Sequence, residues 1–409
     1  MRLSIAPKSK DLSFRRSNSA LFGIAIVVAS TRGVFEALLD RTIAYLIQII
    51  LICVPILLIE YRSRRIDPKR RFFSKSSPSA EFFWVILLSV ASVLVTTAVK
   101  GTTGLQYLLV LIFTWFLLTF ATQQIRRPTL DYRFCFWIST LSATVLGLVG
   151  LLQQLLIFPL ELPGYTNLYD VIRPPSLTAS YLHYPLVIAI ATCNCYVAVT
   201  TGIRLAVIPM IFLAMVTFGS FSRSGMLILF AAFGLSMLAN RKQATRSLGI
   251  FAGIFVLIII LGTQLDSDTL SILDRLTSSI DIKSTGNDIR YGFWLEALKM
   301  LSPLNLLVGS YFGLVTNSAP DNIRDIYGVV ESSPLQQILN IGFVGTIIYY
   351  HTFYRLIHGF SKHDHFSKYI LAAAAVQSLF YQSIEVIPFL VMIITTAVLS
   401  SSLRNEISK

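Results

Sequence analysis

Residues 104–121 read GLQYLLVLIFTWFLLTFA, and no side chain in this stretch is charged. A helix needs about 20 predominantly apolar residues to cross the hydrocarbon core of a bilayer, so the stretch predicts a membrane-spanning helix. The chain of 409 residues is similar throughout, because 54% of it is hydrophobic, 13% is charged and its mean hydropathy is +0.68. Soluble globular proteins do not have this composition. The sequence therefore predicts an all-α, polytopic bundle of transmembrane helices.

Twelve apolar runs of this kind divide the chain. We expect spans close to residues 20–35, 43–61, 81–99, 104–121, 134–158, 177–200, 205–221, 225–239, 247–264, 335–353, 369–383 and 386–403. Nine of these spans fall within residues 1–264 and three within residues 335–409. Residues 265–334 lie between the two groups and form a long extramembrane loop, in which we expect short helices.

The Lys and Arg residues predict how the spans are oriented. The two termini and every second connection together hold 24 of the 34 basic residues. Basic connections are retained in the cytoplasm. Both termini are therefore expected on the cytoplasmic side of a bacterial inner membrane, and the 265–334 loop is expected in the periplasm. Topology thus accounts for the net charge of +13, and no nucleic-acid partner is expected.

No cofactor and no metal are expected. The four cysteines lie inside apolar runs and have the spacing of neither a disulfide framework nor a zinc site: Cys53, Cys135, Cys193 and Cys195. The Asp-Ser-Asp run at 266–268 has the form of a metal-binding acid pair. It lies just outside a predicted helix end, where acidic loop residues are common.

Two arginines on the predicted outer side are candidate phosphate ligands. Arg173 begins a Pro-rich segment that leads into the sixth span, and Arg223 lies in GSFSRSG, a turn of small residues at 219–225. A guanidinium fork suits phosphate oxygens. Snorkelling at the membrane interface explains each arginine equally well when it is taken singly. We interpret five other charged residues near helix ends as interfacial anchors: Arg32, Glu36, Asp40, Arg41 and Lys100.

The 265–334 loop contains an amphipathic run at 288–301. In this run Ile289, Phe293, Ala297 and Met300 share one helical face. The pattern predicts an interfacial helix. A packing lid without chemistry is the alternative interpretation of the loop.

Four motifs follow one another on the predicted outer side. They are SRSG at 222–225, RYGFWLEAL at 290–298, PLNLLVGSYFG at 303–313 and ESSPLQQILNIGFVG at 331–345. In their order and spacing, the chain resembles the O-antigen polymerase and ligase family from about Arg173 to Tyr350, whereas its first third is similar only in hydropathy. Members of that family are integral-membrane glycosyltransferases that use a saccharide on undecaprenyl pyrophosphate as donor and need no nucleotide sugar. The resemblance implies a periplasmic loop over a cavity that opens to the membrane.

The resemblance also implies roles for single residues. Arg223 and Arg290 are assigned to the pyrophosphate, with Arg173 as a third candidate, and Glu331 is assigned as the general base for the acceptor hydroxyl. Glu331 stands where ligases typically carry His, which favours a polymerase. An ion pair between Glu331 and an arginine that only holds the loop is the alternative. Four aromatic side chains offer faces on which sugar rings could stack, with membrane-interface belting as the alternative: Tyr291, Trp294, Tyr311 and Tyr327.

The sequence therefore predicts a polymerase that transfers a growing glycan from undecaprenyl pyrophosphate to a new lipid-linked repeat unit at the periplasmic face. Its expected partners are the undecaprenyl-pyrophosphate-linked oligosaccharide, membrane lipid, a chain-length regulator and a flippase. An O-antigen ligase, which transfers glycan to lipid A core or to protein, is the nearest alternative. A transporter or flippase for lipid-linked saccharide is the alternative from another class, although the sequence has no convincing internal repeat.

Overall fold

The computed structural model describes residues 9–67, 79–158, 166–168, 171–220, 222–239, 285–359 and 365–407, together with the isolated positions 249 and 253. Within these ranges the chain is helical apart from one short hairpin, in which β1 (Thr166–Leu168) pairs antiparallel with β2 (Val171–Arg173). The predicted all-α class is confirmed. The predicted ninth span at 247–264 and the acid pair at 266–268 lie outside the described residues.

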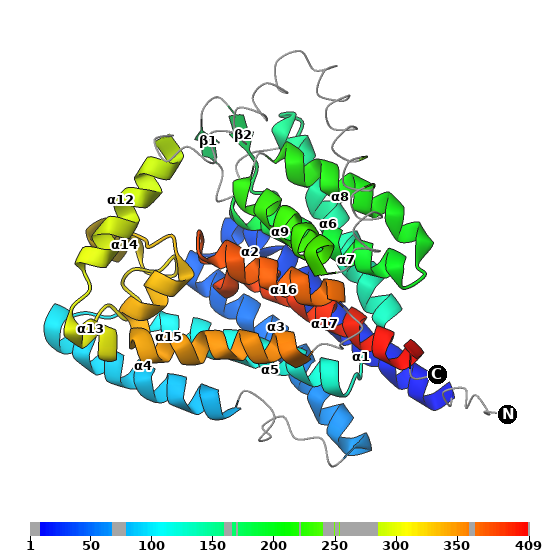
Figure 1. The fold of residues 1–409 in the computed structure, drawn as a ribbon, viewed down its shortest axis with the longest axis horizontal. Coiled ribbons are helices and arrows are strands. Elements are labelled where there is room, and N and C mark those ends of the chain that lie inside the picture. Colours follow the sequence, from blue (N-terminus) through cyan, green and yellow to red (C-terminus); the bar gives the residue numbers. More distant parts are fainter. Residues whose placement is uncertain are drawn as a thin grey trace.

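The helices follow the apolar runs closely (Figure 1). Their bounds are α1 Ser9–Ser30, α2 Arg32–Leu38, α3 Arg41–Ile66, α4 Ser79–Lys100, α5 Gln106–Arg126, α6 Tyr132–Gln154, α7 His183–Thr200, η1 Arg204–Ala206, α8 Val207–Gly219, α9 Arg223–Ala239, α12 Thr285–Lys299, α13 Pro303–Leu307, α14 Asp321–Tyr327, α15 Ser333–Gly359, α16 His365–Ser378, η2 Ser383–Glu385 and α17 Ile387–Ile407. The short helices expected in the 265–334 loop are present as α12, α13 and α14.

By length and composition, α3, α4, α5, α6 and α7 can each cross a membrane, and the bent pair α1–α2 makes a sixth candidate among the described residues. The apolar stretches of α8, α9 and α17 are shorter. The chain is therefore a membrane protein by its helices, whereas the predicted number of twelve spans remains a prediction.

The first predicted span, at 20–35, is bent in the structure. A bend of 58° separates α1 from α2. At the bend, the Thr31 hydroxyl donates to the carbonyl oxygen of Val27 at 2.9 Å, and Thr31 has non-helical backbone angles. A Thr side chain that bonds back to the preceding turn bends a helix. The amide of Gly33 then donates to Leu177 O at 2.7 Å, which ties α2 to the segment before α7.

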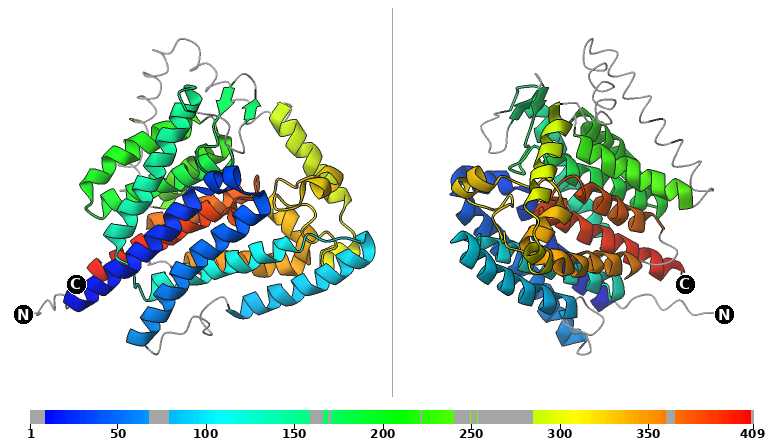
Figure 2. Two further views of the ribbon diagram at one scale, coloured as in Figure 1. Left: turned by 180° about the vertical axis from the view of Figure 1, so that it is seen from behind. Right: turned by 60° about the vertical axis from the view of Figure 1, so that its left-hand side comes forward.

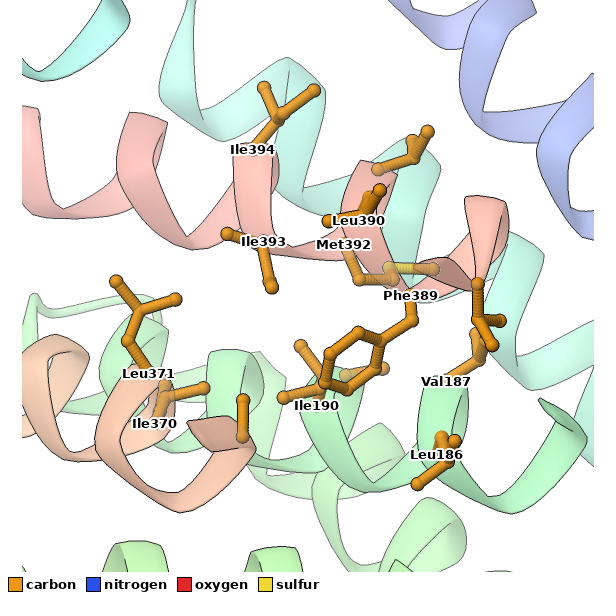
Figure 3. Close-up of a cluster of buried hydrophobic side chains, with 14 of the residues drawn as sticks. Leu186, Val187, Ile190, Ile370, Leu371, Phe389, Leu390, Met392, Ile393 and Ile394 are labelled. Atoms are coloured by element: carbon orange, nitrogen blue, oxygen red, sulfur yellow. The ribbon is translucent and has the colours of Figure 1, made fainter. Parts of the chain in front are cut away.

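The core of the bundle lies around α5, α7 and α17. In α7, 83% of the apolar window is buried inside the protein, against 22% in α4, so α7 is central and α4 peripheral. Ile190 of α7, Leu371 of α16 and Phe389 of α17 belong to one buried apolar cluster (Figure 3). The hydroxyl of Thr396 in α17 donates to Asn194 Oδ1 in α7 at 2.7 Å, so this buried polar pair is satisfied.

The segment 309–313 is fixed by its backbone at a break in α15. Gly342 has φ +75° and ψ 173°, which interrupts the helix. Just before this break, the carbonyl of Leu339 accepts from the amides of Ser310 and Tyr311, both at 3.1 Å. The side chain of Asn340 accepts from the amide of Gly313 at 2.7 Å. The GSYFG motif is therefore a docking segment for the break in α15.

A second backbone contact fixes the same segment to the start of α5. The amide of Gly104 donates to Phe312 O at 3.1 Å, and Gly104 and Gly313 approach so closely that a Cβ on either would collide with the backbone of the other. Gly313 also has φ +71°, which residues with a side chain rarely adopt.

The predicted amphipathic helix at 288–301 is present as α12. Ala297 is buried against Val315, Val330 and Leu339, and Met300 packs beside them. Helices α12, α13 and α14 thus gather at one end of the bundle, at the opposite end from the start of α1 and the end of α17 (Figures 1 and 2).

Gly313→Ala is expected to lower the free energy of unfolding by about 2 kcal/mol or more, because the new methyl group meets the Gly104 backbone and the positive φ is strained. Gly234→Ala in α9 is the matched control, since no atom lies near its Cβ position, and it is expected to be neutral or stabilised by up to about 1 kcal/mol. Thermal unfolding of the purified protein in detergent measures both. Equal unfolding temperatures for the two variants would contradict the proposed role of the contact.

Candidate functional site

A cavity of about 720 Å³ lies where several helices begin. Its wall includes the first residues of α3, α5 and α7, the segment 179–183, the segment 317–331 and the residues just before α17. Charged and titratable side chains contribute to it from α2 and from all of these elements except α5: Arg32, Glu36, Asp40, Arg41, Tyr45, Tyr181, His183, Arg324, Glu331, Tyr381 and Glu385. The predicted membrane topology puts all of these helix starts on the outer side.

The cavity faces the positive ends of helix dipoles. Helix α3 begins at Arg41, α5 at Gln106 and α7 at His183, and all three residues line the cavity. Glu331 and Glu385, two more lining residues, each lie two positions before a helix, α15 and α17 respectively. Each helix start carries roughly half a positive elementary charge. This arrangement favours an anion in the cavity.

Three arginines add formal positive charge to the wall. Arg32 forms an ion pair with Glu36 at 2.6 Å and lies 5.1 Å from the ring centre of Tyr45. Arg41 donates from Nη2 to the carbonyl oxygen of Asn317 at 2.8 Å, which links the start of α3 to the loop over the cavity. Arg324 reaches the wall from α14.

Two of the four carboxylates on the wall stabilise the local helices. Glu36 is paired with Arg32, and Asp40 caps α3 by accepting from the amide of Thr42 at 2.8 Å and from that of Ile43 at 3.4 Å. An N-cap of this kind contributes about 1 kcal/mol. The other two, Glu331 and Glu385, are the candidates for acid–base chemistry.

Glu385 is held by neutral donors. Tyr107 of α5 donates its hydroxyl to Oε1, Gln337 Nε2 of α15 donates to the same oxygen at 2.5 Å, and Gln336 Nε2 donates to Oε2 at 3.0 Å. Burial raises the pKa of Glu385 from 4.5 to about 7, and the three hydrogen bonds oppose that rise. The pKa of this carboxyl therefore lies near neutral pH.

The predicted base, Glu331, lines the cavity. The predicted sugar-stacking residue Trp294 is one contact away, because its indole Nε1 donates to Glu331 O at 3.3 Å. Arg173 is also one contact away, with its guanidinium 5.8 Å from the ring centre of Tyr181, which lines the cavity.

The other predicted aromatic residues lie away from the cavity wall. Tyr311 and Tyr327 form an edge-on pair with ring centres 6.1 Å apart, and Lys100 lies 4.5 Å from the ring centre of Tyr311. Tyr291 is on α12 and 49% exposed. In this conformation Tyr311 and Tyr327 pack the loop over the bundle.

Of the predicted pyrophosphate ligands, Arg223 is not among the described residues that line the cavity, and the side chain of Arg290 lies outside the described part of the structure. Arg223 is the first residue of α9, and Arg290 belongs to α12. In the SRSG motif, Ser222 caps α9, because its hydroxyl accepts from the amide of Gly225 at 3.3 Å. The structure thus gives this motif a local structural role as well.

Sequence reasoning did not single out Arg324 or Glu385, and it interpreted Arg32 and Arg41 as interfacial anchors. A signal for Glu385 is present, because it is a lone acidic residue between the apolar runs at 369–383 and 386–403. No comparable signal marks Arg324, which lies in a polar loop. No family model matches this sequence, and no curated protein matches it. A function for this chain is therefore inferred from the residues of the cavity and not from a relative.

Thr42→Cys is expected to react with a membrane-impermeant maleimide in cells with a permeabilised outer membrane, because Thr42 is exposed and lines a cavity that the predicted topology opens to the periplasm. Ser17→Cys is the matched control, since Ser17 is exposed near Arg62 at the other end of α3. It is expected to react only after the inner membrane is disrupted. The opposite labelling pattern would show that the predicted orientation is inverted.

Proposed function

We propose that this chain is an integral-membrane glycosyltransferase of the polymerase type, which extends a glycan carried on undecaprenyl pyrophosphate at the periplasmic face of the inner membrane. The observation that carries the proposal is the cavity, where helix starts, three arginines and the carboxylates of Glu331 and Glu385 meet. The four sequence motifs support the same function.

The reaction requires two forms of assistance that this cavity can supply. The anomeric carbon of the growing glycan forms a bond to the acceptor hydroxyl oxygen as its bond to the pyrophosphate oxygen breaks. The departing undecaprenyl pyrophosphate needs its negative charge stabilised, and the acceptor hydroxyl needs a base. Helix starts and guanidinium groups meet the first need, and a carboxylate meets the second.

Arg41 and Arg324 are the structural candidates for the pyrophosphate. Both lie on the cavity wall, and Arg32, the third arginine there, contacts Glu36 and the ring of Tyr45. Arginine suits this role because it stays charged and offers a fork of N–H donors to phosphate oxygens. Arg223 and Arg290 remain the candidates that the sequence motifs favour.

Two apolar side chains on the wall suit the lipid part of the donor. Leu46 of α3 is 39% exposed and Leu109 of α5 is 44% exposed, and both line the cavity. An isoprenoid chain that passes these leucines would leave the pyrophosphate beside the helix starts. This geometry supports a lipid-linked donor over a free nucleotide sugar.

Purified protein in detergent is expected to elongate lipid-linked saccharide extracted from source cells that lack this chain. Arg41→Lys and Arg324→Lys should slow elongation about 10- to 100-fold, because each loses a charge-assisted hydrogen bond worth roughly 1.5–3 kcal/mol. Arg127→Lys is the control, since Arg127 pairs with Asp67 at the other end of α3, and it should keep the wild-type rate. The readout is the ladder of glycan lengths on a gel.

The same series separates the alternatives. Selective loss in Arg223→Lys and Arg290→Lys would move the pyrophosphate to the pair that the motifs favour. A wild-type protein that produces no ladder would overturn the polymerase. In cells, loss of a polymerase should leave single repeat units on the final acceptor, whereas loss of a ligase should leave that acceptor bare.

A further inference from the structure

Glu385 occupies an unusual place in the fold. It ends η2, the short link between the apolar helices α16 and α17, and its side chain is partly buried and lines the cavity. A carboxylate in such surroundings is costly unless other groups satisfy it. The groups that contact Glu385 therefore indicate its role in the cavity.

The hydrogen bonds of Glu385 are unequally divided between its two oxygens. Oε1 accepts from Tyr107, Gln336 and Gln337, whereas Oε2 accepts from Gln336 alone. Gln336 and Gln337 also donate to the Tyr107 hydroxyl, at 3.2 and 2.6 Å, so α5, η2 and α15 share one network. In the described part of the chain, no arginine, lysine or histidine forms an ion pair with Glu385. The network orients the carboxylate and leaves Oε2 with spare acceptor capacity.

We propose that Glu385, rather than Glu331, is the catalytic base that takes the proton from the acceptor hydroxyl. The inference rests on the proposed glycosyl transfer and assigns one step within it. As the hydroxyl oxygen bonds to the anomeric carbon, its proton passes to Glu385 Oε2, and undecaprenyl pyrophosphate leaves with the electron pair of the broken bond. Glu385 then releases the proton to water in the cavity. The backbone carbonyl of Glu331 accepts from Trp294 and helps to hold the loop.

The environment of Glu385 suits this step. A base works best when its pKa lies near the working pH, since it must both gain and lose a proton. Burial without a cationic partner brings the pKa of Glu385 to about 7. A carboxylate paired with arginine would hold its proton far more weakly and would be a poorer base.

Other titratable groups near Glu385 have to be distinguished from it. Four tyrosines interact electrostatically with Glu385: Tyr45, Tyr107, Tyr349 and Tyr350. Phenol groups ordinarily titrate near pH 10. The cavity wall adds the charged groups Arg32, Glu36, Asp40, Arg41, Arg324 and Glu331. His183, which contacts the Tyr381 hydroxyl at 3.1 Å, is the one wall residue whose type ordinarily titrates near neutral pH.

The elongation assay with the extracted lipid-linked saccharide tests the assignment. Glu385→Gln is expected to reduce the elongation rate about 100-fold or more, which is the usual effect of losing a general base. Glu331→Gln is the matched comparison, because it changes the other available carboxylate on the wall, and it should keep a larger share of the rate. Thermal unfolding of both variants reports whether they are folded.

The pH dependence gives a second readout that a structural role would not change. The ionised form of Glu385 is the active one, so the elongation rate should rise through pH 7 and should be roughly tenfold lower at pH 6 than at its plateau. Gln337→Ala removes a hydrogen bond that lowers the pKa of Glu385, so the inflection should move to higher pH. Gln106→Ala removes a donor to Ser318 O on the same wall and should leave the inflection of the pH profile unchanged. His183→Gln should also leave the inflection unchanged.

The outcomes distinguish the proposal that Glu385 is the base from the proposal that the chain is a glycosyltransferase. An inflection that moves with Gln337→Ala supports Glu385 even if Glu385→Gln fails to fold. If Glu385→Gln keeps the wild-type rate and pH profile and Glu331→Gln loses both, Glu385 is not the base. The proposal of a glycosyltransferase would still stand. An inflection that disappears in His183→Gln or stays fixed in Gln337→Ala also counts against Glu385. A wild-type protein that does not elongate at all overturns both proposals.

Discussion

The architecture of the cavity depends on one backbone interaction, the docking of residues 309–313 against the break in α15. A helix that continued through Gly342 would keep its carbonyl groups for its own hydrogen bonds. Because the helix breaks there, the carbonyl of Leu339 is available to the amides of Ser310 and Tyr311, and the side chain of Asn340 beside it accepts from the amide of Gly313. The loop that follows is thereby held over the starts of α3 and α5. Its residues 317–331 then complete the cavity wall.

The placement of helix starts decides the electrostatic character of the site. The positive ends of the helix dipoles of α3, α5 and α7 favour an anion in the cavity. The wall carries three arginines but also four carboxylates, so formal charge by itself would not favour a pyrophosphate. Two of those carboxylates are used locally, Glu36 by Arg32 and Asp40 by the first turn of α3. The helix starts therefore add positive charge that a count of formal charges on the wall leaves out.

The carboxylates of the cavity have different roles because their hydrogen-bond partners differ. Asp40 faces backbone amides at a helix start and stabilises a helix. Glu385 faces a phenol and two amides inside the protein, which satisfy its hydrogen bonds without a compensating positive charge. This environment supplies hydrogen-bond donors to the carboxylate but no positive charge. Burial therefore raises the pKa of Glu385 toward neutrality. The packing of α5 and α15 against η2 thus determines what Glu385 can do.

The sequence by itself determined the helical class, the position of most apolar helices and the amphipathic helix α12, because hydropathy and its period are local properties of the chain. It also identified Glu331, since a motif marks it. It did not determine which helix ends meet, so Arg32 and Arg41 looked like separate anchors, and Arg324 and Glu385 were not singled out. Only the tertiary structure brought these residues to one cavity. Their proximity depends on packing and on a backbone break that joins residues far apart along the chain, and local composition does not encode such contacts.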